Sequence, residues 1–213
     1  MRHLDQPSLF PAAGWEVLPL PSASVRLWRG WLADKEAHAL YERLSATLQW
    51  EQPSLTIAGK THRIPRLQAW HGDADAVYRY SGTTFTPAPW TPELLYLKQR
   101  LEAACDARFN SMLANWYRTG SEGMGFHADK EPELGREPLI ASLSLGGARR
   151  FVLKPVPKLE VESLSVCLGN GDLLEMAGTT QRYWRHGIPK TTRAVAARIN
   201  LTFRFIANKP FNR

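Results

Sequence analysis

Two stretches in the first half of the chain place apolar residues at the spacing of an amphipathic helix. The first begins at Asp34, and its apolar residues recur every three or four positions, on one face of a helix. They are Ala37, Leu40, Tyr41, Leu44 and Leu48. The second follows Thr91-Pro92, a capping residue and a proline suited to the first helical position. Its apolar residues are Leu94, Leu97, Leu101, Ala104 and Cys105. We therefore predict two helices, with Cys105 in the core rather than at a reactive surface.

After Asn110 the pattern changes to short β-strands separated by turns. The predicted strands are 112–117, 139–145, 150–154, 164–168, 172–176, 183–186 and 198–206. Glycine-rich turns such as Gly146-Gly147 separate several of them. Many short strands at this spacing are typical of a double-sheet sandwich or a jelly roll. The stretch 54–86 is also rich in β-formers and glycine, and it predicts hairpins ahead of the second helix.

The length of 213 residues suits one domain with a core of its own. We expect a single domain over 1–213. Within it, 1–90 contribute an N-terminal arm, the first helix and the hairpins, and 91–213 contribute the second helix and the β core. Four prolines in the first 25 residues predict an extended, loosely structured arm.

Composition narrows the class of protein. The chain is 44% hydrophobic and 22% charged, as in an ordinary globular protein. No run approaches the roughly 18 apolar residues of a membrane span, and the first residues lack the apolar segment of a secretory signal. Only two cysteines occur, too few for a disulfide framework. We therefore expect a cytoplasmic protein without a membrane partner.

The charge balance points to a polyanionic partner. The formal net charge is +7 and the sequence pI is about 9.6. A basic domain attracts nucleic acid, although solubility alone also explains such a charge. Eight tryptophans are present, and tryptophan serves both cores and base-stacking surfaces.

A candidate metal site begins with His127-Ala128-Asp129. In an extended segment these two polar side chains point to the same face, but a lone pair of this kind is often accidental. His186, late in the β region, supplies a possible third ligand. Two histidines and one carboxylate leave open positions on an octahedral metal, as in non-haem Fe(II) oxygen chemistry. The other histidines, His3, His38, His62 and His71, are better explained without metal.

The last predicted strand has two chemically different faces. Ile199, Leu201, Phe203 and Phe205 line the face expected in the core, and Arg198, Asn200, Thr202 and Arg204 line the other. A solvent-exposed sheet face is one interpretation. The other is a carboxylate clamp, because guanidinium groups bind carboxylates through two parallel hydrogen bonds. Asn115 and Tyr117 share one face of an earlier strand, opposite Trp116, so a small dicarboxylic ligand would suit both strands.

These residues resemble those of a known family. The order Asn115-x-Tyr117, His127-x-Asp129, His186 and Arg198-x-Asn200-x-x-x-Arg204 is similar to the AlkB family of Fe(II)- and 2-oxoglutarate-dependent dioxygenases. Pro65-Arg66-Leu67, Trp70-x-Gly72, the run 140–146 and the run 200–204 resemble its subgroup that repairs alkylated DNA. The resemblance covers about residues 55–206. It implies a mainly β fold with flanking helices, in which a double-stranded β-helix (jelly-roll) core carries an N-terminal nucleotide-recognition lid.

The resemblance also implies an activity and its residues. His127, Asp129 and His186 would bind Fe(II), and Asn115, Tyr117, Arg198, Asn200, Thr202 and Arg204 would bind 2-oxoglutarate. With O2 as the second co-substrate, the implied reaction is oxidative demethylation of N-alkylated bases in DNA, with RNA a further substrate. Decarboxylation of 2-oxoglutarate is coupled to hydroxylation of the methyl group, which then leaves as formaldehyde.

The lid residues are implied in the same way. Tyr78 and Tyr80 match positions that contact the flipped base, although two half-buried tyrosines in a hairpin would give the same pattern. Glu131 matches a carboxylate near the base edge. Arg66, with nearby Lys60, His62 and Arg63, forms a basic cluster suited to phosphates, and a solvated hairpin would look the same.

The hairpin tip departs from the family pattern. Duplex-preferring relatives insert an aromatic side chain just before the Gly59-Lys60 position, whereas this tip contains Ile57 and Ala58. We therefore expect single-stranded substrates to be preferred. We also expect the protein to act as a monomer. Two rival interpretations remain at this stage: a related dioxygenase acting on protein or another small substrate, and a non-catalytic nucleic-acid-binding module.

Overall fold

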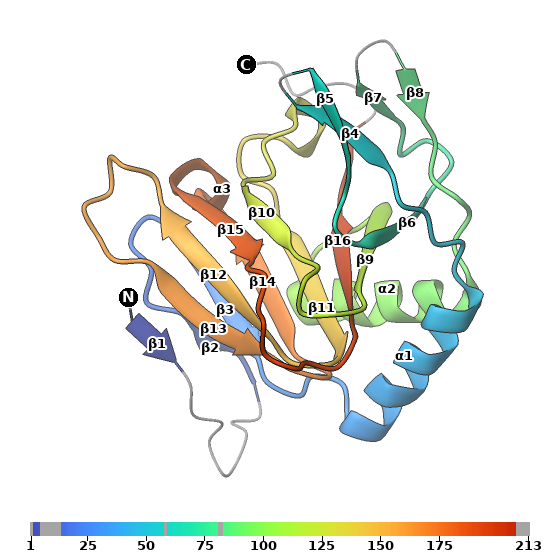
Figure 1. The fold of residues 1–213 in the computed structure, drawn as a ribbon, viewed down its shortest axis with the longest axis horizontal. Helices are drawn as coiled ribbons and strands as arrows, with labels where there is room; N and C mark the ends of the chain where they lie inside the picture. Colours follow the sequence, from blue (N-terminus) through green and yellow to red (C-terminus); the bar gives the residue numbers. More distant parts are fainter. Residues whose placement is uncertain (1, 5–13, 58, 81–82, 208–213) are drawn as a thin grey trace.

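The computed structural model describes residues 2–4, 14–57, 59–80 and 83–207, and its centre is a pair of β-sheets (Figure 1). The five-stranded sheet has the order β1 (Arg2–Leu4), β13 (Leu164–Leu168), β12 (Arg149–Pro155), β15 (Trp184–Ile188) and β10 (Met124–His127). The seven-stranded sheet has the order β2 (Glu16–Val17), β3 (Ser24–Trp28), β14 (Leu173–Ala177), β11 (Ile140–Gly146), β16 (Arg198–Arg204), β9 (Ser111–Tyr117) and β6 (Leu67–Gly72). This arrangement confirms the predicted jelly-roll core.

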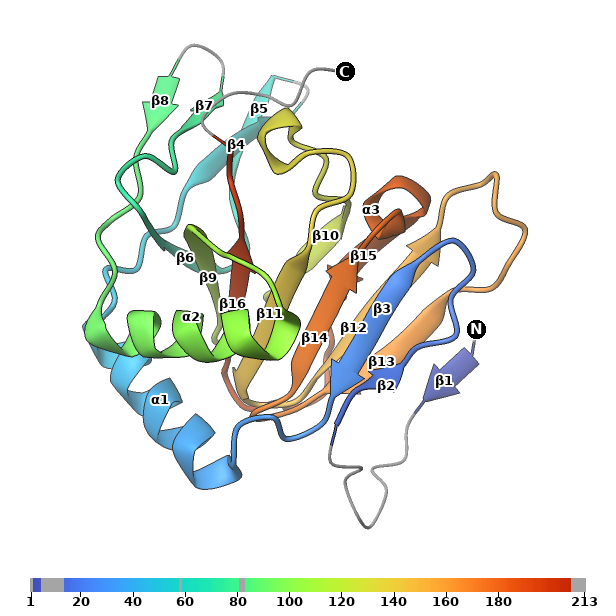
Figure 2. The same ribbon diagram turned by 180° about the vertical axis from the view of Figure 1, so that it is seen from behind.

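Two helices, α1 (Asp34–Thr47) and α2 (Pro92–Cys105), cover one face of the seven-stranded sheet (Figures 1 and 2). Helix α2 begins where predicted, since the Thr91 side chain accepts a hydrogen bond from the Leu94 N–H at 3.3 Å. Helix α1 packs against β11 and β16, and the apolar stripes of both helices share one core with these strands. The buried residues of this layer include Leu44, Leu97, Leu101, Leu143, Leu201 and Phe203.

A second core fills the space between the two sheets. It includes Ile140 and Leu174 from one sheet and Phe151, Leu153, Val166 and Trp184 from the other. The seven-stranded sheet is therefore buried on both faces. This double burial explains why β11 is buried along nearly its whole length.

Two of our predictions about strands are wrong in detail. The first 25 residues are not simply a loose arm, because β3 begins at Ser24 and pairs with β14, with Val25 and Leu27 fully buried. Phe205 does not extend the apolar face of the last strand: it is 47% exposed. The strand ends at Arg204 because Ile206 instead turns inward and donates its N–H to the Asn110 side chain at 2.7 Å.

Two hairpins, β4 (Ser54–Ile57) with β5 (Lys60–Arg63) and β7 (Tyr78–Tyr80) with β8 (Thr83–Phe85), project beyond one end of the sheets (Figure 1). The predicted hairpins are confirmed. Their role as a lid stays a prediction, because Ala58 and the side chains of Ile57, Lys60, Tyr78 and Tyr80 lie outside the described residues. A short helix, α3 (Thr180–Tyr183), and a 3-10 turn at Pro132–Leu134 complete the elements. In the described part of the chain, no helix is long and apolar enough to span a membrane.

Candidate metal and co-substrate site

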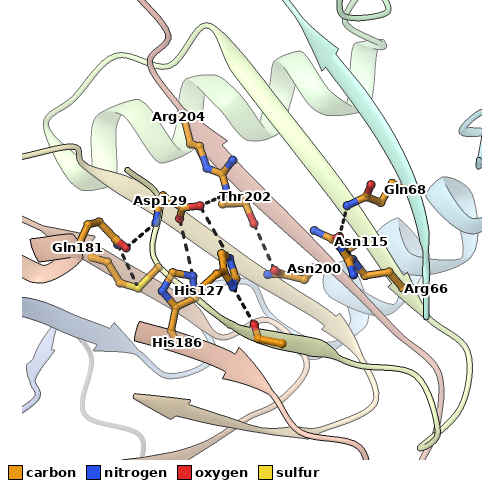
Figure 3. Close-up of polar contacts among 12 residues, drawn as sticks. Arg66, Gln68, Asn115, His127, Asp129, Gln181, His186, Asn200, Thr202 and Arg204 are labelled. Carbon is orange, nitrogen blue, oxygen red and sulfur yellow. Dashed lines mark hydrogen bonds and ion pairs between the residues drawn. The ribbon is translucent and has the colours of Figure 1, made fainter. Parts of the chain in front are cut away.

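Three predicted metal ligands meet at two adjacent strands of the five-stranded sheet (Figure 3). His127 ends β10 and lies opposite His186 of β15, because the two residues are register partners. The carboxylate of Asp129 lies 3.8 Å from His127 Nε2 and 3.7 Å from His186 Nε2. The candidate ligand atoms all lie within 4.8 Å of one another. This group could therefore hold one metal ion.

The Asp129 side chain is buried, yet its surroundings favour the charged form. Burial alone would raise its pKa, but Arg204, His186 and His127 lower it, so the pKa falls below its ordinary value. Arg204 contributes most of this lowering, with Nη2 3.1 Å from Asp129 Oδ1. The other oxygen, Oδ2, is buried without a hydrogen-bond donor among the described residues. A buried carboxylate oxygen without a donor fits a bound cation.

The chemistry of the histidines fits Fe(II). Burial lowers the pKa of His186 to about 3, so its imidazole is neutral at physiological pH and offers a lone pair to a metal. Two imidazoles and one carboxylate form the ligand set of non-haem Fe(II) centres and leave coordination positions free for co-substrates. The residues present therefore suit the metal that the sequence led us to expect.

Groups behind the ligands fix their orientation. Gln181 of α3 is buried, and its side-chain oxygen accepts the Asp129 N–H at 3.0 Å (Figure 3). His127 Nδ1 lies 2.9 Å from the Gly125 carbonyl oxygen, which leaves Nε2 toward Asp129. Gln181 is not predicted by the sequence, because a single buried amide in a one-turn helix produces no periodic pattern.

The polar face of β16 points toward the five-stranded sheet rather than to solvent. Arg198 is 1% exposed and Thr202 7% exposed, so a solvated sheet face is excluded. On the neighbouring β9, Tyr117 is the register partner of Arg198 and Asn115 that of Asn200. A narrow cavity is lined by both predicted groups, including His127, His186, Asn115, Tyr117, Asn200, Thr202 and Arg204. The structure thus joins the metal ligands and the polar strand face in one site.

Donors in this site lack acceptors. Within the described residues, Arg198 donates one hydrogen bond, to Ser144 Oγ at 2.9 Å, while its Nε and Nη1 are buried and unpartnered, as is Nε of Arg204. Burial lowers the pKa of Arg198 to about 10, which still leaves it charged at neutral pH. Burial also raises the pKa of Tyr117, so its hydroxyl keeps its proton. Unpartnered buried donors of this kind are suited to a carboxylate.

Two serines of β11 belong to the same network, and the sequence contained a pattern that could have identified them. Ser142 Oγ accepts from Asn200 Nδ2 at 2.8 Å, and Ser144 accepts from Arg198. They alternate with the apolar residues Ala141, Leu143 and Leu145. Alternation along a strand paired with β16 places both hydroxyls on the clamp side.

Arg66 lies in a different setting from the one we expected. It is 7% exposed, and its Nε donates to Asn115 Oδ1 at 2.7 Å, alongside Gln68 Nε2 at 3.0 Å. His62 and Arg63 are exposed on β5. Arg66 is therefore buried behind the polar face, because β6 pairs with β9 next to Asn115.

The remaining residues singled out from the sequence have structural settings. His38 is exposed on α1, and His71 is buried with Nδ1 2.7 Å from the Pro89 carbonyl oxygen. Cys105 is 3% exposed, and burial raises the pKa of its thiol to about 12, so its predicted place in the core is confirmed. Glu131 has one buried carboxylate oxygen without a partner among the described residues.

Comparisons with known proteins agree with this geometry. The profile of the 2OG-Fe(II) oxygenase superfamily matches residues 24–204. Alpha-ketoglutarate-dependent dioxygenase alkB homolog 3 of Homo sapiens is 37% identical, over 99% of this chain and 77% of that protein. DNA oxidative demethylase ALKBH2 of Mus musculus is 36% identical, over 80% of this chain and 75% of that protein.

Solved structures share the fold at lower sequence identity. OsALKBH1 has a TM-score of 0.60 at 19% identity and covers 90% of this chain and 99% of that chain. A 2OG-Fe(II) oxygenase family oxidoreductase from Burkholderia pseudomallei has a TM-score of 0.57 at 16% identity, over 88% of this chain and 89% of that chain. The profile match and the alignments with relatives both extend over most of the sequence, and on that basis the protein belongs to the AlkB family of the 2OG-Fe(II) oxygenase superfamily.

Proposed function

We propose that this protein is an Fe(II)- and 2-oxoglutarate-dependent dioxygenase that removes alkyl groups from the bases of nucleic acid. One observation carries the proposal. His127, His186, Arg204 and Tyr117 line one cavity. Asp129 contacts the first three of these residues, and the buried Arg198 lies against the ring of Tyr117. Relatives named as a dioxygenase and as a DNA oxidative demethylase support the reaction and the substrate.

Each residue of the site has a role in this proposal. His127, Asp129 and His186 would hold Fe(II). The set Asn115, Tyr117, Arg198, Asn200, Thr202 and Arg204 would hold 2-oxoglutarate. Arg204 lies beside Asp129 and would bind the 2-oxo acid end, while Arg198 and Tyr117 would bind the far carboxylate.

The bound metal and 2-oxoglutarate would supply the oxidising chemistry: O2 is consumed, 2-oxoglutarate becomes succinate and CO2, and an N-methyl group becomes N-hydroxymethyl. The hydroxymethyl group then leaves as formaldehyde, and the proton of its hydroxyl group passes to the base nitrogen. The protein holds Asp129 as a carboxylate and His186 as a neutral imidazole, and it keeps water away by burying both.

The basic residues of a second groove next to Asp129 support the proposal of a polyanionic substrate. This groove has a volume of about 450 Å³ and is lined by the cations Lys130, Arg136 and Arg182 and by the carboxylates of Asp129 and Glu137. None of the three cations has an ion-pair partner among the described residues. Together with the net charge of +7, these cations favour nucleic acid. Tyr78 and Tyr80 would contact the flipped base and Glu131 its edge. Arg66, in contrast, would act through Asn115 rather than on a phosphate.

The direct test is aerobic incubation with Fe(II), 2-oxoglutarate and oligonucleotides carrying 1-methyladenine or 3-methylcytosine, followed by mass spectrometry of the bases. We expect loss of the methyl mass with matching succinate, and none without 2-oxoglutarate. Succinate formation with no repaired base in DNA or RNA would point to a protein or another small substrate. Nucleic-acid binding without succinate would point to a non-catalytic module.

Strand preference is a separate part of the proposal. Opening a duplex costs a few kcal/mol per unstacked step, and a tip containing Ile57 and Ala58 fills the vacated space less well than an aromatic ring. Single strands, in DNA or RNA, are therefore the favoured substrates, and we expect the protein to act on them as a monomer. We expect faster repair of a single-stranded lesion than of the same lesion annealed, and Ala58→Phe should narrow that gap by raising the duplex rate. Equal initial rates in the wild type at one salt concentration would contradict this preference.

A further inference from the structure

Three buried guanidinium groups surround Tyr117. Arg66, Arg149 and Arg198 are 7%, 2% and 1% exposed. The guanidinium carbons of Arg149 and Arg198 each lie 5.7 Å from the centroid of the Tyr117 ring. None of the three arginines forms an ion pair with a carboxylate in the part of the chain that the structure describes. The carboxylates of Glu122 and Asp172 offset part of the charge of Arg149 and Arg198 without pairing with them directly, but burial still lowers the pKa of all three arginines. A net positive charge therefore remains beside Tyr117.

Arg149 is the member of this group without a role so far. It lies on β12, on the opposite sheet from Tyr117. In the part of the chain that the structure describes, its guanidinium donates only to backbone carbonyl oxygens. Nη1 contacts Thr119 at 3.2 Å, and Nη2 contacts Glu122 at 2.8 Å and Pro189 at 3.0 Å. Arg149 thus ties the loop after β9 to the segment after β15, and both segments adjoin the cavity residues Tyr117 and Ile188.

Hydrogen bonds to carbonyl oxygens satisfy the donors of Arg149 but do not neutralise its charge. A buried charge that is only partly compensated is costly, and Arg149 and Arg198 flank the same ring. An anion that enters next to Tyr117 would lower the electrostatic energy of both groups. A ligand with a neutral end at this position would not. The charge of Arg149 therefore discriminates between ligands at the far end of the cavity.

We propose that Arg149 is a positioning and specificity-determining residue for the far carboxylate of the co-substrate, acting through Tyr117 and the two segments it ties together. This inference rests on the proposed use of 2-oxoglutarate and extends it. Arg149 makes the site select a dicarboxylic 2-oxo acid over a monocarboxylic one, without touching the metal ligands.

The test compares two ligands of equal length that differ only at the far end. Protein loaded with Mn2+ under anaerobic conditions is titrated calorimetrically with 2-oxoglutarate and with 2-oxopentanoate, in which a methyl group replaces the far carboxylate. The variants are Arg149→Met, Arg149→Lys and, as a matched control, Arg150→Met. Arg150 follows on the same strand but is exposed on its other face.

We expect Arg149→Met to weaken 2-oxoglutarate binding about tenfold, the scale of one lost charge interaction in a partly screened site. Binding of 2-oxopentanoate and of Mn2+ should change little. Arg149→Lys, which keeps the charge, should recover most of the preference for 2-oxoglutarate even if its melting temperature falls, so it carries the test if Arg149→Met does not fold. Arg150→Met should match the wild type.

Two outcomes would overturn the inference. An equal loss of affinity for both 2-oxo acids would mean that Arg149 only supports the structure, and an unchanged affinity for 2-oxoglutarate would mean that its charge does not reach the ligand. Failure of the proposed function looks different, because the wild-type protein itself would then bind neither 2-oxo acid.

Discussion

The two ends of the cavity balance their charges in different ways. At the metal end, Asp129 and Arg204 form an ion pair at 3.1 Å, and His127 and His186 adjoin the same carboxylate. At the far end, Arg66, Arg149 and Arg198 adjoin Tyr117, and no carboxylate pairs with them among the described residues. The metal end therefore contains its own ion pair, whereas the far end keeps a net positive charge that an anionic ligand would offset. Substitutions at each end should have separable effects.

The largest effect is expected at the metal end. Asp129→Ala removes the one carboxylate of the ligand group, and it also leaves Arg204 without its ion-pair partner. We expect turnover to fall below detection and Mn2+ binding to be lost, because a three-ligand site with open positions depends on each ligand. The checks are isothermal titration with Mn2+ and the base-repair assay, with circular dichroism as the control for folding. Repair at an undiminished rate with added iron would remove Asp129 from the site.

Arg204→Lys tests how the co-substrate is bound at the end of the cavity next to Asp129. Lysine keeps the charge beside Asp129 but loses the planar fork, and Arg204 has an unpartnered Nε available for a ligand. We expect 2-oxoglutarate binding to weaken by about 1.5–3 kcal/mol, the scale of a hydrogen bond to a charged group. The apparent KM for 2-oxoglutarate should then rise at least about tenfold, while Mn2+ affinity changes little. An unchanged KM would place the ligand away from Arg204.

Gln181→Met removes the hydrogen bond that holds the backbone of the metal ligand Asp129 and leaves the ligand itself in place. Methionine has a similar length but cannot accept the Asp129 N–H, so the carboxylate should be held less firmly. We expect Mn2+ affinity to fall on the order of tenfold, as is typical for groups that orient metal ligands, and Gln181→Glu, which keeps an acceptor, to lose less.

The control for Gln181 is Asn170→Leu. Asn170 Oδ1 accepts the backbone N–H of Gly146 at 2.8 Å, the same kind of bond in a turn that does not contribute to the cavity lining. The Asn170→Leu variant should have an altered melting temperature but the same Mn2+ affinity as the wild type. If both variants reduced Mn2+ affinity equally, the effect of Gln181→Met would be one of general stability.

The sequence predicted the parts of this site that follow a regular pattern. Alternation along 198–204 placed Arg198 and Arg204 on one face and Leu201 on the other, and the structure has this arrangement. Strand pairing then brought His127 and His186 together, which no local pattern specifies. The setting of Arg66 was missed for the same reason, since its burial depends on the pairing of β6 with β9. Gln181 and Arg149 act through contacts with distant backbone groups, which leave no periodic trace in the sequence.

The smallest expected effect concerns a loop next to the far end. Glu122 accepts hydrogen bonds from Arg118, and its own carbonyl oxygen accepts from Arg149. Burial would raise the pKa of Glu122, but Arg118 and, to a smaller extent, Arg149 lower it by more, so the folded-state pKa lies below the ordinary value of 4.5. A lowered pKa stabilises the fold above pH 4.5, and this contribution is lost as the pH falls through the folded-state value.

Glu122→Gln should remove this pH dependence. Because Arg118 is 42% exposed, solvent screens the pair, and we expect a loss of only about 0.5 kcal/mol in the free energy of unfolding at pH 7. As the pH falls through the folded-state pKa of Glu122, the wild type and Glu122→Gln should converge in stability. Urea unfolding at a series of pH values from 7 downward measures both the deficit at neutral pH and its loss in acid. If the loss in the free energy of unfolding stayed the same at every pH, it would come from the packing of the loop rather than from the charge of Glu122. Under both outcomes we expect Mn2+ binding at the metal end to be unchanged.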